Sequence, residues 1–156
     1  MKLLSRETDR AVWLLDTKER EGLLFLMGTG ARRREVNPAK GFDAVGIEDS
    51  DETELEGWLR EHRNSASLEI SDQLNDPELC VRRRGGHAWT LLHGQSELLL
   101  QVLNELRISA WKRLGQPPEV LPDPLPPPGT DDYIDCWIME TASIFQSQLL
   151  QGLESE

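Results

Sequence analysis

The sequence predicts a mainly α fold: a small helical domain with a C-terminal helical hairpin and a minor β-hairpin. Leucines recur at helical spacing from Leu98 to Leu114, and a second apolar stripe with the same period runs from Tyr133 to Leu153. Between the stripes, residues 116–129 hold seven of the nine prolines and cannot continue a helix. Two amphipathic helices joined by such a connector are expected to pack against each other.

The composition sets the class of protein. With 156 residues and 38% apolar content, the chain is expected to form one domain, residues 1–156, with a sizeable core. Its net charge of −11 repels phosphate, so nucleic-acid binding would require a local basic patch. No apolar run approaches the ~20 residues of a membrane span, and no secretory segment follows the first residues. We therefore expect a cytoplasmic protein with no membrane partner.

The N-terminal elements are predicted from short patterns. The apolar run Ala11–Leu15 favours a strand or the lead-in to a helix. Asp16–Glu19 has the pattern of a capping box, so a helix is expected to begin there and to extend to Met27. Gly28–Gly30 would end this helix by supplying left-handed conformations. Residues 29–48 show no sustained period and are predicted to form a loop.

A short acidic helix is predicted next. Ser50 can cap a helix over Asp51–Glu61, whose early acidic residues suit the positive end of the helix dipole. Three apolar side chains share one face of this helix and are expected to pack: Leu55, Trp58 and Leu59. The polar segment Asn64–Asn75 is predicted to be a loop or a single turn.

The remaining elements complete the fold. Leu79–Leu92 contains two short runs around Gly85–Gly86 and is predicted to form a β-hairpin. Ser96 is expected to cap the first long helix, Gly115 to end it, and Thr130 to cap the last helix. The two stripes are expected to meet through Leu103, Leu106, Ile138 and Phe145.

Two arginine runs are the candidate anion-binding sites. Guanidinium groups suit phosphate oxygens, so Arg32–Arg34 or the run Arg82, Arg83 and Arg84 could contact nucleic acid. In a chain this acidic, such runs more often form solvated faces or pair with acids of the same chain. Arg82–Arg84, beside the Gly-Gly turn, is the better candidate of the two.

The sequence offers little for catalysis or metal binding. Cys80, His87, His93 and Cys136 lack the closely spaced pairs of a structural zinc site, so we expect no metal and no cofactor. No glycine-rich phosphate loop or Ser/His/Asp grouping is recognisable. Nothing marks Cys80 or Cys136 as an activated thiol, and both are expected to be free. We therefore favour a protein that is not an enzyme.

The C-terminal helices and the N-terminal segment together resemble the bacterial family named after AosR, an actinobacterial oxidative-stress transcriptional regulator. The resemblance covers residues 1–27 and 97–156 and does not extend through the middle of the chain. The segments that carry it are Leu14–Glu19, Leu23–Leu24, Leu103–Arg107, Arg113–Gly115, Asp132–Tyr133, Phe145–Gln146 and Leu149–Leu150.

The resemblance implies a largely helical regulator that works with the transcription machinery, for example through a sigma factor. It also implies a redox input through a Cys-x-x-x-Cys pair. This chain departs from that pattern, because its two cysteines are far apart in the sequence. Cys80 and Cys136 could form a bridge only if the fold brings their Cα atoms within ~7 Å. We therefore give little weight to redox sensing.

The function we expect is that of a non-enzymatic, cytoplasmic regulatory protein that binds another protein, in transcription or stress control. Trp111 or Trp137 would serve as the aromatic anchor of the interface. Two alternatives stay open: a regulator that binds nucleic acid directly through Arg82–Arg84, and an enzyme with an unrecognised site. A homo-oligomer is compatible with the sequence.

Overall fold

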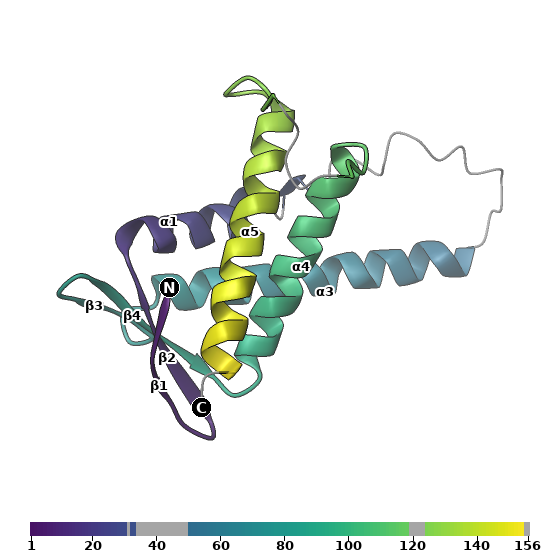
Figure 1. Cartoon of the computed structure of the whole chain (residues 1–156). Helices are drawn as coiled ribbons and strands as arrows, with labels where there is room; N and C mark the ends of the chain where they lie inside the picture. The colour runs from purple at the N-terminus through teal and green to yellow at the C-terminus, as the bar shows by residue number, and fades with distance from the viewer. Residues whose placement is uncertain (31, 34–49, 119–123, 155–156) are drawn as a thin grey trace.

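The computed structural model describes residues 1–30, 32–33, 50–118 and 124–154, with the side chains of 50–54 and 56 left aside. The described chain is mainly helical, as predicted, and carries a small antiparallel sheet (Figure 1). In chain order the elements are β1 (Lys2–Arg6), β2 (Arg10–Leu15), α1 (Thr17–Phe25), η1 (Leu26–Gly30), α3 (Ser50–Asn75), β3 (Cys80–Arg83), β4 (Gly86–Leu92), α4 (Gln95–Arg113) and α5 (Asp131–Glu154).

The strands form one four-stranded antiparallel sheet in the order β1-β2-β4-β3. The predicted hairpin is confirmed as β3 and β4, which pair around the turn at Gly85–Gly86. β4 also pairs with β2, so Ala11–Leu15 is strand and not the lead-in to a helix. Glycine is needed at position 86, where β4 begins beside the end of β2, because a Cβ there would lie 2.0 Å from the carbonyl oxygen of Leu15. β1 was not predicted.

The start of α1 follows the predicted capping box. The amide of Glu19 donates to Asp16 Oδ1 at 2.8 Å, and the amide of Asp16 donates to Glu19 Oε2 at 2.8 Å. The predicted left-handed stop at Gly28–Gly30 is wrong, since neither glycine has a positive φ and both belong to the π-helix η1. A Cβ on buried Gly30 would lie 2.9 Å from Leu106 Cδ2, so this glycine permits close packing on α4.

The predicted loop over 29–48 falls largely on residues that the structure does not describe, namely 31 and 34–49. Where the structure does describe it, the prediction is wrong: Thr29 and Gly30 belong to η1, and residues 32–33 are helical. The described parts of the 116–129 connector, 116–118 and 124–129, are non-helical, as predicted, and residues 119–123 lie outside the description.

The largest difference from prediction is α3, a single helix from Ser50 to Asn75. The predicted end at Glu61 and the predicted loop over Asn64–Asn75 are both wrong. Ala66, Ile70 and Leu74 recur every four residues and are buried, with exposures of 8%, 0% and 1%. This apolar stripe is narrow, but packing against the rest of the molecule makes the polar segment helical.

The first half of α3 projects from the body of the molecule (Figure 1). The predicted packing of its apolar face is wrong: Leu55 and Trp58 are 57% and 60% exposed, and Leu59 is only partly buried. The Trp58 ring stacks on the ring of His62, with centroids 5.5 Å apart.

The two C-terminal helices, α4 and α5, lie side by side (Figure 1). The cap of α4 differs from prediction. Its N-cap is Gly94, whose φ of 79° is left-handed, and Ser96 is instead a buried residue inside the helix. Thr130 caps α5 as predicted, because its Oγ1 accepts from the amide of Tyr133 at 3.2 Å.

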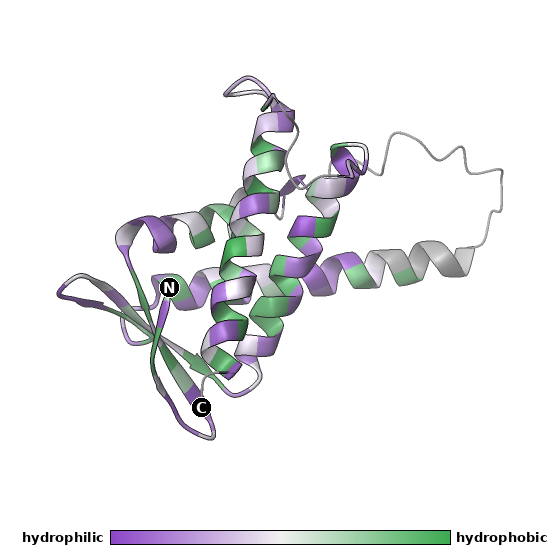
Figure 2. Cartoon of the chain, viewed as in Figure 1, coloured by the Kyte–Doolittle hydropathy of each residue, from purple (hydrophilic) through white to green (hydrophobic). Residues whose placement is uncertain are grey.

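One continuous core joins the sheet to the helices. Figure 2 shows apolar residues on strands of the sheet and along α4 and α5. Trp13 and Trp89, neighbours across β2 and β4, are fully buried on the helix side of the sheet. Gly152 of α5 rests on Trp13, since a Cβ there would lie 2.3 Å from the indole ring. Among the described residues, no helix is both long and apolar enough to cross a membrane.

Candidate protein-interaction surface

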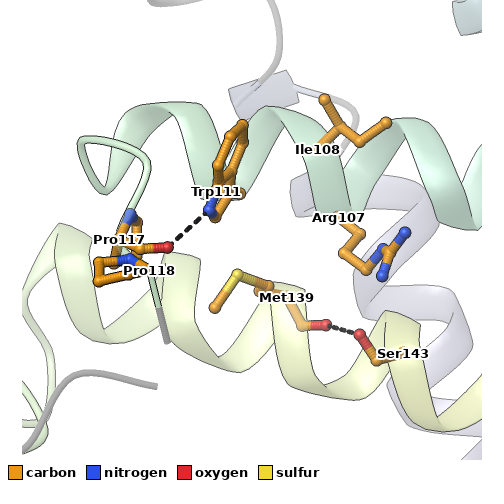
Figure 3. A pocket seen from close by; sticks show the side chains of 7 residues that line it. All are labelled: Arg107, Ile108, Trp111, Pro117, Pro118, Met139 and Ser143. Atoms are coloured by element: carbon orange, nitrogen blue, oxygen red, sulfur yellow. Dashed lines mark hydrogen bonds between the residues drawn. The ribbon is translucent and has the colours of Figure 1, made fainter. Parts of the chain in front are cut away.

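A hollow of about 310 Å³ lies between α4, α5 and the start of the proline connector (Figure 3). We call it the α4–α5 hollow. Its walls are mostly apolar: Arg107, Ile108, Trp111, Pro117, Pro118, Met139 and Ser143 line it. Trp111, one of the two predicted anchors, is partly exposed and forms part of this wall.

The connector fixes the Trp111 ring. After α4 the chain reverses through Gly115 and Gln116, both with positive φ, at 80° and 58°. This reversal brings the carbonyl of Pro117 to the indole, whose Nε1 donates to it at 3.0 Å (Figure 3). The ring is therefore held by its polar edge while part of its apolar surface stays open.

A second hollow, of about 490 Å³, lies between α1 and α5. Trp137, the other predicted anchor, meets Phe25 there edge to face, with ring centroids 4.8 Å apart and planes at 81°. Both rings are at least partly exposed. The remaining lining residues are Lys18, Glu21, Gly22, Tyr133 and Ile134. The two predicted anchors thus lie in separate hollows.

A cluster of charged side chains, centred on a buried carboxylate, connects α5 to its neighbours. Asp135 of α5 is 2% exposed and accepts from two arginines. Arg113 of α4 donates through Nη2 to Asp135 Oδ1 at 2.8 Å, and Arg33 donates through Nη2 to Asp135 Oδ2 at 3.0 Å. The carboxylates of Asp135 and Asp131 raise the pKa of the Arg33 guanidinium. The cluster ties α5 to α4 and to the segment that follows η1.

Sequence reasoning missed this cluster. The available signal was an acidic residue between Ile134 and Ile138, on the side of α5 that the apolar stripe buries. In the run Arg32–Arg34, Arg33 pairs with acids of its own chain, as the acidic composition favoured. The Nε of Arg32 donates to the carbonyl of Gly28 at 3.4 Å. Arg34 lies outside the described residues.

Arg82, Arg83 and Arg84 are all exposed at the end of β3 and in the turn after it. Within the described part of the chain, no ion pair or side-chain hydrogen bond engages them. They lie on the sheet, whereas the α4–α5 hollow is formed by helices, so the predicted partner-binding residues do not form one site.

The two cysteines are free and buried, on β3 and α5. Burial raises the pKa of the Cys80 thiol, and the nearby Arg20 only partly opposes it. Burial also raises the pKa of the Cys136 thiol, and Asp132, Asp135 and Glu140 raise it further. Among the described residues, no group of three His, Cys, Asp or Glu side chains is placed to hold a metal ion.

Comparison of the chain with protein-family models, curated proteins and solved structures gives no match. Membership of the AosR family therefore stays a prediction that rests on the sequence resemblance.

Proposed function

We propose that the chain is a non-enzymatic regulatory protein that acts by binding another protein. The observation that supports this proposal is the position of Trp111 in the α4–α5 hollow. Tryptophan is among the residues that most often carry interface energy, and here its exposed surface adjoins Ile108 and Met139. The hollow has room for a large apolar side chain of a partner.

The polar groups of the hollow indicate what that partner offers. The indole N–H is engaged by Pro117, and the Ser143 hydroxyl donates to the carbonyl of Met139 at 2.8 Å (Figure 3). Arg107 is exposed at the edge and carries the positive charge of the lining. A partner with an apolar side chain next to an acidic one would complement both features.

The setting we propose is transcription or stress control in the cytoplasm, with a transcription factor such as a sigma factor as the partner. The support for this setting is the resemblance of the C-terminal and N-terminal segments to the AosR family. Affinity capture from host cells with the wild type and with Trp111→Ala tests it: loss of a sigma factor or RNA polymerase from the variant's eluate is the expected result.

The α4–α5 hollow can be tested with a random 12-residue peptide library displayed on phage. We expect enriched peptides to carry a large apolar residue beside an acid, and to lose at least tenfold in affinity for Ile108→Glu. Ile108 is 39% exposed at the hollow, so the change adds charge at little cost to folding. The matched control is Ile144→Glu on α5, at a side chain that is 49% exposed and lies outside the lining.

Peptides that bind Ile108→Glu and Ile144→Glu with equal affinity would place the interaction outside the α4–α5 hollow.

The competing function is direct nucleic-acid binding through Arg82–Arg84, and the exposure of all three side chains favours it. A gel shift at ~50 mM salt is the sensitive assay, because low salt exaggerates phosphate affinity. Sub-micromolar binding of promoter DNA that is lost on neutralising the three arginines would favour this alternative.

A further inference from the structure

The sheet has a second face that is apolar and partly open to solvent. Side chains alternate across a strand, so the residues between the buried ones of β2 and β4 point away from the helices. The register places Leu14 beside Ala88 and Val12 beside Thr90. We call this surface the outer face; its members are Val12, Leu14, Val81, Ala88 and Thr90, all partly exposed.

This composition is unusual for a sheet with one face covered. Antiparallel strands normally alternate between apolar residues facing the core and polar residues facing water. In β2 and β4 the inward residues Trp13 and Trp89 are fully buried, yet most of their outward neighbours are aliphatic as well. Leu92, at the end of β4, adds a side chain that is 47% exposed. Such an apolar surface is typical of an interaction site.

Basic residues occupy the margins of the outer face. Lys2 pairs with Leu14 in the register, Arg10 pairs with Leu92, and Arg83 pairs with Gly86. All three are exposed. Arg10 is neutralised by Glu7, whose Oε2 accepts from its Nε at 2.9 Å. In the described part of the structure, no ion pair engages Lys2 or Arg83, so two positive charges at the margins of the outer face are open to a partner's carboxylates.

The charge and the side chains narrow the choice of occupant. A second copy stacked on the same face would bring like-charged margins together. Proteins that bind single-stranded nucleic acid on a sheet stack the bases on aromatic rings, whereas the tryptophans of β2 and β4 are buried on the opposite face. An anionic bilayer is an extended surface, so it would also repel the acidic remainder of this chain. A short acidic segment would contact only the basic margins.

We propose that the outer face binds an acidic amphipathic segment of a partner protein. Its apolar side chains pack on Val12, Leu14 and Ala88, and its carboxylates lie near Lys2 and Arg83. This proposal goes beyond the function argued from Trp111, because the outer face is formed by strands and shares no residue with the α4–α5 hollow.

The probe is a synthetic 18-residue amphipathic peptide of leucine and glutamate, with the corresponding leucine–lysine peptide as its control. The full-length protein is labelled at its methyl groups, and binding is followed by NMR. We expect the acidic peptide to shift the methyl signals of Val12, Leu14 and Val81, and the basic peptide to leave them unchanged. Arg83→Glu should weaken binding at least tenfold, and Ile108→Glu should not alter it. The matched charge control is Arg60→Glu, at an exposed arginine on α3.

Four results would overturn the proposal. The first is equal binding of the two peptides, and the second is the absence of methyl shifts at millimolar acidic peptide. The third is methyl shifts that follow protein concentration without peptide, which would assign the face to a second copy of this chain. The fourth is binding to phosphatidylserine vesicles together with failure to bind the peptide, which would assign it to a membrane surface. The two proposals can fail separately. If Ile108→Glu abolishes binding of the phage-selected peptides but the acidic peptide causes no methyl shifts on the outer face, only the outer-face proposal is wrong.

Discussion

At the scale of single residues, Asp135 shows how a charge is accommodated in this core. Its side chain is 3% exposed, and the guanidinium groups of Arg33 and Arg113 lie within 3.0 Å of its oxygens. A buried carboxylate is tolerated when it is paired and its oxygens accept hydrogen bonds. Removing its charge takes away the carboxylate that pairs with Arg113, which is only 10% exposed, and leaves Arg33 with the exposed Asp131 as its counter-ion.

Asp135→Asn should therefore lower the free energy of unfolding by about 3 kcal/mol, the magnitude usual for breaking a buried ion pair. Urea unfolding followed by circular dichroism measures it. The control is Asp131→Asn, which removes a carboxylate that also pairs with Arg33 but is 84% exposed. Exposed pairs contribute about 0–1 kcal/mol. Equal losses for the two variants would contradict the assigned role of Asp135.

At the scale of elements, α3 shows how packing can override a weak local pattern. Its second half contains serines and asparagines, and its apolar residues form only a narrow stripe. The stripe nevertheless meets η1 and α4, and the segment is helical. The first half has stronger helix signals in the sequence, yet its Leu55 and Trp58 are exposed to solvent. The local pattern there correctly predicted a helix but wrongly predicted that these side chains would be buried.

The contact between η1 and α4 provides a test at this scale. Leu106 is fully buried, so Leu106→Ala should cost about 2–5 kcal/mol of unfolding free energy. Thermal melts check this, with Ile144→Ala at a 49% exposed side chain as the small-effect control. Gly30→Ala should destabilise the wild type, because its Cβ would meet Leu106.

The double variant sharpens this test. In the Leu106→Ala background the leucine methyl groups are gone, so Gly30→Ala should cost less than it does in the wild type. A Leu106→Ala protein that melts like the wild type, or a Gly30→Ala cost that is the same in both backgrounds, would contradict the packing described for η1 and α4.

At the scale of the whole molecule, the two thiols lie on different elements and both are buried. We expect mild peroxide to leave them unlinked, because burial raises both pKa values and a raised pKa means less thiolate at neutral pH. Mass spectrometry of non-reduced digests measures the linkage. Alkylation should be slow in the native protein, faster at higher pH, and fast for both cysteines in urea. A Cys80–Cys136 linked peptide in high yield would restore the redox-sensor interpretation.

Part of the candidate site was accessible to sequence reasoning. Trp111 or Trp137 was predicted as an anchor because tryptophan often carries interface energy, and the structure places both at partly exposed positions. Arg82–Arg84 was identified because it adjoins a Gly-Gly turn. The outer face was missed, since two strands with apolar residues on both sides give no alternation to interpret.

The mainly helical class, the capping box at Asp16, the Thr130 cap and the β3–β4 turn were all predictable from the sequence. Each depends on residues within a few positions of one another, where backbone geometry and short-range hydrogen bonds decide the outcome. Four other features became evident only in the folded chain: the extent of α3, the pairing of β4 with β2, the glycine contacts of Gly30 and Gly152, and the ion cluster at Asp135. These depend on groups brought together from distant parts of the chain, whose burial and pairing energies exceed the local preferences that a sequence displays.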